Sequence, residues 1–428
     1  MSVYATFCFI AAASMLITFV NSKIGHMQNT IAITAGSLLL SLFIVIAGKN
    51  GFIQLQNIAS AQLAGLDFES FLLNGILGFL LFAGGLGIKL DHMKDQKWEI
   101  TILALGATLF STAFVGIALW SVCLLVGLPL DFIYCLLFGA LISPTDPIAV
   151  LAIVKKLKAP KRIAIQIEGE SLFNDGFGLV IFITVYSVAF ATGEPTFSSV
   201  SLLFLHEAIG GILYGLVLGV FFHYLISATD DHAMELLLTV MIPTGGYVLA
   251  QTLGVSGPLA MVVAGIFIGN ITRKTGFSQA SKEQLDHFWE LVDEFLNGVL
   301  FLLIGLTMLQ FTFHFEDALL VVIAIPVVLM ARYLSVKASY VGFHRFRSYN
   351  PYAISILTWG GLRGGLALAM AMAIPSGILV IADKNIDVRE IILVMTYGVV
   401  FFSILVQGST IIPLIKKAKI WQHKHEQS

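Results

Sequence analysis

Long apolar segments follow one another along almost the whole chain, and short stretches rich in charge, glycine or proline separate them. Many of them reach the length of about 20 residues that an α-helix needs to cross a bilayer. Helices taken from the apolar runs, with boundaries at the polar breaks, give thirteen predicted spans. They lie at residues 3–20, 29–48, 71–90, 98–127, 130–154, 163–191, 200–226, 233–252, 257–270, 287–310, 317–340, 353–376 and 390–415.

This pattern predicts an all-α polytopic membrane protein with a single membrane domain over residues 1–428 and no soluble domain. The hydrophobic fraction of 57%, the charged fraction of 12% and the mean hydropathy of +0.91 exclude an ordinary soluble domain. The three cysteines lie in apolar runs without metal-ligand spacing, so we expect them to be buried small hydrophobes. We expect no cofactor and no nucleic-acid partner.

Lysine and arginine are distributed unevenly between the two sets of predicted loops. With the N-terminus outside, the inner segments carry 19 of them and the outer segments carry three. This ratio follows the positive-inside rule and predicts a cytoplasmic C-terminus. The remaining two, Arg332 and Arg363, fall inside predicted spans.

The fifth and twelfth predicted spans are interrupted in the middle, by PTDP at residues 144–147 and by GGLRGG at residues 360–365. Proline removes a backbone donor and clashes with the preceding turn, so we expect unwinding that exposes the Thr145 carbonyl beside Asp146. A simple proline kink is the alternative. Because the two broken spans are seven apart, two six-span units would be inverted relative to each other, as in many secondary transporters.

The sixth predicted span contains a polar stretch, IEGESLFNDGFGLV. Its polar side chains are Glu168, Glu170, Ser171, Asn174 and Asp175. Four-residue spacing places Ser171 and Asp175 on one helix face, with Glu170 and Asn174 on an adjoining face. From Ile163 at the cytoplasmic side, Glu170 lies about 10 Å and Asp175 about 18 Å along the helix axis. Glu168 is closer to the interface, either as a snorkelling side chain or as a charge at the entrance.

Several carboxylates in one membrane helix need partners or water, because each costs roughly 2.5–3.5 kcal/mol near the centre of a span. Hydrogen bonding between helices usually relies on Ser, Thr or Asn instead. We therefore interpret the stretch as a transport site.

Each of the two arginines inside the predicted spans lies at the depth of an acidic side chain. Arg332 is about 8 Å from the cytoplasmic end of its span, the depth of Glu170. Because a buried arginine keeps its charge, Glu170 is its best predicted partner. Arg363 lies about 16 Å along its span from the cytoplasmic end. We predict either that Arg363 neutralises the C-terminal ends of the half-helices while Asp146 neutralises their N-terminal ends, or that Arg363 bonds Asp146 directly.

The motifs SPTDPIAV, EGESLFND, FWELVDEFLNGVLFLLIGL and TWGGLRGGLALA resemble those of the monovalent cation:proton antiporter-1 family, in particular its short prokaryotic sodium/proton antiporters. The resemblance covers nearly the whole chain. It implies a homodimer of thirteen-helix subunits in the bacterial or archaeal plasma membrane, with crossed discontinuous helices. It also implies a core around spans 4–6 and 11–13 that moves against a dimer domain. The implied ion site comprises Asp175, Ser171, the Thr145 carbonyl and Asp146, with Asn174 and a Glu170–Arg332 pair alongside.

These residues predict obligatory exchange, because one carboxylate, Asp175, holds either a proton or a hard monovalent cation that oxygen ligands complete. If Glu170 and Arg332 stay charged as a fixed pair, a single unit of charge is exchanged, so we expect electroneutral one-for-one exchange of Na⁺ or Li⁺ for H⁺. A K⁺/H⁺ antiporter is the nearest alternative. A cation channel is less favoured because no filter segment is visible, and an intramembrane hydrolase is less favoured still.

Overall fold

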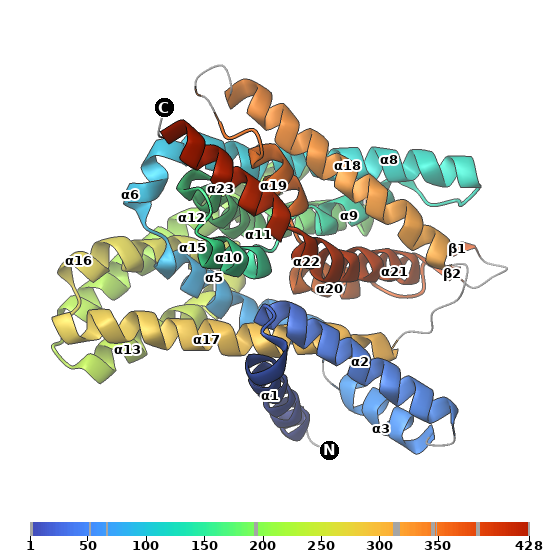
Figure 1. Cartoon of the computed structure of the whole chain (residues 1–428), viewed down its shortest axis with the longest axis horizontal. Helices are drawn as coiled ribbons and strands as arrows, with labels where there is room; N and C mark the ends of the chain where they lie inside the picture. The colour runs from blue at the N-terminus through green and yellow to red at the C-terminus, as the bar shows by residue number, and fades with distance from the viewer. Residues whose placement is uncertain are drawn as a thin grey trace.

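The computed structural model describes residues 3–50, 53–65, 67–191, 196–310, 317–343, 347, 349–381 and 386–426, and within them the chain is nearly all helical (Figure 1). Ten helical segments in these ranges are long and apolar enough to cross a membrane. They are Tyr4–Gly25, Asn29–Lys49, Phe68–Gly87, Leu90–Val126, Lys161–Ala189, Ser198–Ser227, His232–Thr252, Ser281–Leu309, Ala318–Phe343 and Val388–Thr410. The prediction of a helical membrane protein is confirmed; the count of thirteen stays a prediction.

Most of these segments are single helices or helices with a π-helical turn. The elements are α1 (Val3–Val20), α2 (Asn29–Lys49), α3 (Ile53–Ala64), α4 (Phe68–Ser70), α5 (Leu77–Gly87), α6 (Leu90–Met93), α7 (Lys97–Thr101), α8 (Thr108–Val126), α11 (Lys161–Ala189), α12 (Phe197–Ser227), α13 (His232–Met241), α14 (Tyr247–Thr252), α17 (Gln279–Leu306), α18 (Asp317–Phe343), α21 (Val388–Phe401) and α22 (Gly408–Thr410). π-Helical turns lie at Asn21–Gly25, Phe71–Ile76, Ile102–Ala107, Ile242–Gly246, Ile268–Thr272 and Phe402–Gln407.

The three remaining predicted spans consist of shorter helices. The fifth contains α9 (Phe132–Ile142) and α10 (Ile148–Leu157), and the twelfth contains α19 (Ala353–Trp359) and α20 (Gly365–Met372). The ninth contains α15 (Gly257–Phe267), which continues through a π-helical turn to α16 (Arg273–Thr275). Both predicted interruptions are therefore present, and each is a stretch of non-helical backbone rather than a kink.

Helix packing gathers these elements into two sets. In one, α8 contacts α9 and α18, while α18 also contacts α21. In the other, α15 contacts α5 and α12, while α17 contacts α1 and α2. Each set contains a close helix approach that leaves no room for a side chain, at Gly139 against the Thr112 carbonyl and at Gly265 against the Phe82 carbonyl. Independent movement of the two sets, and their inverted-repeat relation, stay predictions.

The structure departs from the predicted spans at three places. The last span ends at Thr410, and a separate helix, α23 (Ile412–Glu426), follows, since Pro413 suits the first turn of a new helix. Helix α17 begins at Gln279 rather than at residue 287. A short antiparallel hairpin, β1 (Leu379–Ile381) with β2 (Ile386–Asp387), pairs Leu379 with Asp387 and lies at the opposite end of the molecule from α6, α13 and α16 (Figure 1).

Two of the basic residues counted for the predicted orientation, Arg345 and Lys384, lie outside the described residues.

Candidate functional site

The two interrupted spans meet at their unwound segments. The Asp146 backbone N–H donates to the Leu362 carbonyl at 2.9 Å, which joins the segment between α9 and α10 to the segment between α19 and α20. Thr145 in the first segment and Leu362 in the second are both buried. Non-helical backbone at membrane depth is thus enclosed by protein and partly satisfied by its counterpart. That the helices themselves cross stays a prediction.

Arg363 neutralises the C-terminal end of α9. Its guanidinium Nη1 donates to the carbonyls of Ser143 and Pro144, both at 2.9 Å, where α9 has ended. The side chain is 2% exposed. Of the two predicted arrangements, the structure has the contact with half-helix carbonyls, and Arg363 makes no hydrogen bond to Asp146 in the part of the chain that the structure describes.

Asp146 lies at the start of two half-helices. Its Oδ1 accepts from the backbone N–H of Ile148, the first residue of α10, at 2.9 Å. A Cβ added at Gly364 would collide with its Oδ2, so the carboxylate also lies directly against the start of α20. Positive N-terminal ends favour a negative charge at this position.

Arg332 binds the C-terminal end of α19 and at the same time pairs with Glu170. Both ends of the guanidinium contact the Glu170 carboxylate, with Nη2 to Oε2 at 3.0 Å. Nε and Nη2 also donate to the Leu357 carbonyl in the last turn of α19, at 3.2 and 3.0 Å. The two side chains are 6% and 2% exposed. The contact with Leu357 had no signal in the sequence, because a backbone acceptor carries no residue type.

Helix α11 brings the remaining predicted residues against the first unwound segment. The Ser171 hydroxyl donates to the Thr145 carbonyl. Asn174 brackets Thr145: its Nδ2 donates to the Thr145 hydroxyl at 2.8 Å, and its Oδ1 accepts from the Thr145 N–H at 3.4 Å. Gly178 leaves room for Pro144 to pack on the helix. Asn174 therefore holds the Thr145 turn in place.

Asp175 differs from its neighbours because its carboxylate is half-buried and makes no hydrogen bond to any described residue. It is close enough to Asp146 for the two charges to interact. Carboxylate, hydroxyl and backbone carbonyl oxygens are ligands that a hard cation prefers. Glu168 is half-buried and likewise makes no hydrogen bond within the described chain.

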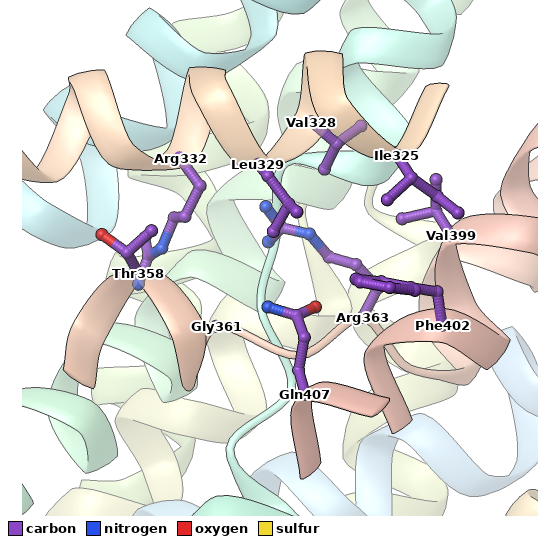
Figure 2. Close-up of a pocket in the computed structure, with 10 residues that line it drawn as sticks. All are labelled: Ile325, Val328, Leu329, Arg332, Thr358, Gly361, Arg363, Val399, Phe402 and Gln407. Atoms are coloured by element: carbon purple, nitrogen blue, oxygen red, sulfur yellow. The ribbon is translucent and has the colours of Figure 1, made fainter. Parts of the chain in front are cut away.

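Two cavities adjoin this site. One is lined by Thr145, Ser171, Glu170, Arg332 and neighbouring residues. The other lies between α18 and the C-terminal part of the last span. Figure 2 shows Arg332 extending from α18 beside Thr358, while Arg363 rises from the unwound segment near Gly361.

One structural residue escaped the sequence reasoning. The Ser403 hydroxyl accepts from the Arg363 N–H at 2.9 Å and so fixes the second unwound segment from the last span. A serine in an otherwise apolar run was the only available signal. Among the described residues, no three His, Cys, Asp or Glu side chains gather in a way that suits a bound metal.

Comparison with known proteins gives consistent matches over nearly the whole chain. The family model described as "Sodium/hydrogen exchanger, transmembrane" matches residues 9–417. A Na⁺/H⁺ antiporter, NhaP, of Pseudomonas aeruginosa is 40% identical over 410 residues, 95% of each chain. The antiporter NhaH of Halobacillus dabanensis is 35% identical over 82% of this chain and 83% of its own. The solved sodium proton antiporter MjNhaP1 of Methanocaldococcus jannaschii shares the fold, with a TM-score of 0.75 and 18% identity over 97% of this chain and 98% of that one.

Proposed function

The chain belongs to the sodium/hydrogen exchanger family and is a Na⁺/H⁺ antiporter rather than an enzyme, and we propose that it exchanges one Na⁺ or Li⁺ for one H⁺ by alternating access. The observation that carries this proposal is the Asp175 carboxylate, which has no hydrogen-bond partner among the described residues although it lies in a membrane helix. A carboxylate in this state is available to a proton or to a cation. Binding of either one excludes the other.

The oxygen atoms that would complete a cation site are those around Thr145. We propose that the Ser171 hydroxyl and the Thr145 carbonyl, now bonded to each other, turn their lone pairs toward a cation that Asp175 holds. Asp146 contributes directly or through water. Because Asn174 uses both ends of its amide on Thr145, its role in this scheme is to position the carbonyl.

Charge balance supports a one-for-one exchange. Glu170 and Arg332 form a buried pair that does not change protonation during transport, because arginine keeps its proton. Arg363 neutralises the C-terminal end of α9, Asp146 neutralises the N-terminal end of α10, and Asn174 is uncharged. Among the residues of the ion site, Asp175 is the one left to exchange its charge, so each cycle moves one positive charge in each direction and no net charge. No observation favours the potassium exchanger or the channel.

Replacing Asp175 tests the site. In everted membrane vesicles with a pH-sensitive dye, we expect Asp175→Asn to abolish the fluorescence change on addition of Na⁺ or Li⁺. Asp230→Asn, which makes the same change in an exposed loop, is the control and should exchange normally. Full exchange by Asp175→Asn would overturn the assignment.

The stoichiometry needs a separate measurement. On a solid-supported membrane electrode, electroneutral exchange gives no steady current, and collapse of the membrane potential leaves the exchange rate unchanged. A sustained Na⁺-dependent current would contradict one-for-one exchange while leaving the antiporter itself intact.

The oligomeric state, the membrane and the orientation of the chain are also proposals. We infer a homodimer in the prokaryotic plasma membrane, with the N-terminus outside and the C-terminus in the cytoplasm. The uneven distribution of lysine and arginine supports this orientation. Helix α6, which Lys89 and Lys94 flank, and α16, which carries Arg273 and Lys274, lie at the same end of the molecule (Figure 1). Cysteine labelling from each side of the membrane would test it.

A further inference from the structure

Helix α17 carries five acidic residues, and one of them is unlike the others. Asp286 pairs with Arg273 at 2.5 Å, Glu294 accepts from Asn29 at 3.0 Å, and Glu283 and Glu290 are exposed. Asp293 is half-buried, makes no ion pair with a described residue, and is close enough to Asp146 and Lys155 for their charges to interact. It therefore lies within electrostatic range of the ion site.

Its position excludes the simplest structural explanation. An acidic residue stabilises a helix N-terminus only within the first turn. Helix α17 begins at Gln279, so Asp293 lies almost four turns inside it. A half-buried carboxylate in a helix interior needs another reason.

Asn297, one turn further along the same face, is the second unusual residue. It is 5% exposed and lies within reach of Asp293, yet neither its Oδ1 nor its Nδ2 makes a hydrogen bond of normal geometry to a described residue. Buried amides are almost always paired, so an unpaired one indicates a missing partner. A cation held between the Asp293 carboxylate and Asn297 Oδ1 would supply that partner.

The face of α17 that carries these two residues continues to the ion site. Leu300, three residues beyond Asn297, would lie 2.6 Å from a Cβ at Gly365, and the preceding Gly364 abuts the Asp146 carboxylate. From Asp293 to Leu300 the helix rises by about 10 Å. The charge of Asp146 interacts with those of both Asp293 and Asp175, so Asp146 links the two carboxylates electrostatically.

We propose that the Asp293 carboxylate and the Asn297 amide oxygen form a second cation site, here called the vestibule site, through which Na⁺ passes between the cytoplasm and Asp175. This inference rests on the proposed function. Oxygen ligands at this point replace part of the hydration shell of Na⁺ before it reaches the main site. The exposed Lys155 ammonium competes with Na⁺ for Asp293.

The test measures the Na⁺ KM separately on the two faces of reconstituted protein of known orientation. Asp293→Asn should raise the cytoplasmic KM about fivefold or more, with the maximal rate and the opposite-face KM within twofold of wild type. Lys155→Gln should change the cytoplasmic KM in the opposite direction. Glu290→Gln, which removes the same charge from an exposed position of α17, is the matched control and should leave KM unchanged.

Ionic strength separates a bound cation from simple attraction. In high choline chloride a surface-potential effect is screened, whereas the Asp293→Asn effect should persist. Equal shifts in Asp293→Asn and Glu290→Gln that disappear at high ionic strength would overturn the vestibule site, as would an unchanged KM in Asp293→Asn.

Asn297 gives an independent arm. Asn297→Leu removes the amide oxygen at similar volume and should raise the cytoplasmic KM, while Asn297→Asp keeps an oxygen ligand and should not raise it. If Asn297→Leu fails to fold, the Asp293 and Lys155 variants still test the vestibule site. Wild-type protein without Na⁺-driven proton movement would instead refute the proposed function, so the two failures are distinguishable.

Discussion

Helices α9 and α19 are the first halves of the two interrupted spans, and their C-terminal ends are neutralised in different ways. At α19, Arg332 binds the Leu357 carbonyl and also forms an ion pair with Glu170. At α9, Arg363 binds the carbonyls of Ser143 and Pro144 and has no carboxylate partner among the described residues. The first arrangement is locally neutral, whereas the second leaves a positive charge that Asp146 balances from the other side of the unwound segment. Each arginine thus supports the site, but only one protects a buried anion.

The largest effect expected from this comparison is at Arg332. Arg332→Gln leaves Glu170 buried without a counter-ion, and breaking a buried pair in this way costs about 3–5 kcal/mol. We expect a large fall in the thermal unfolding midpoint in detergent, followed by tryptophan fluorescence, together with loss of exchange. A Glu170→Arg/Arg332→Glu double variant should recover part of the stability. A normal unfolding midpoint in the single variant would contradict the assignment.

Arg363→Gln should have a smaller effect. It removes hydrogen bonds to two carbonyls but strands no paired carboxylate, so we expect a loss of about 1–3 kcal/mol. The same unfolding measurement on both glutamine variants makes the comparison direct. If Arg363→Gln proved as destabilising as Arg332→Gln, the ion pair would not be the reason for the difference.

Gly364 allows activity to be changed more than stability. Gly364→Ala would push the Asp146 carboxylate away from the start of α20, because the added Cβ collides with its Oδ2. We expect the exchange rate to fall by at least about tenfold, with a smaller fall in the unfolding midpoint than in either arginine variant. Gly87→Ala is the control, since nothing lies within 4 Å of a Cβ there. Equal activity in the two alanine variants would argue against a role for the Asp146 position.

The smallest expected effect is at Ser403. Ser403→Ala removes the acceptor of the Arg363 N–H, a loss of about 1 kcal/mol. Exchange should remain within a factor of two of wild type, as measured in the vesicle assay. A complete loss of exchange would show that the backbone position of Arg363, rather than its side chain, limits transport.

Much of this arrangement was predictable because membrane segments contain few polar residues. The two breaks followed from the prolines and glycines, and the four-residue spacing of Ser171 and Asp175 placed both on one face of α11. Equal depth was enough to select Glu170 as the expected partner of Arg332. The ion-binding roles of these residues stay predictions until the variants are measured.

Other features escaped prediction for physical reasons. Depth alone left two partners open for Arg363, because backbone carbonyls and a carboxylate lay at the same level. The start of α17 was placed at residue 287 because the preceding residues are polar, although Ser278, whose side chain accepts from the Ser281 N–H, is a helix N-cap. Apolar runs indicate where a helix crosses the membrane, but caps indicate where it begins.

Helix α23 holds the C-terminal end of α10. Lys419 donates to the carbonyl of Leu157, the last residue of α10, at 3.0 Å, and Asn350 donates to the Ala418 carbonyl at 3.0 Å. Together with the hydrogen bond of Asp146 at the first turn, the Lys419 contact holds α10 at both ends. In mechanical terms, a motion that displaces α10 would also load its hydrogen bond to α23. If α10 moves during exchange, a spectroscopic label on α23 would therefore report that movement.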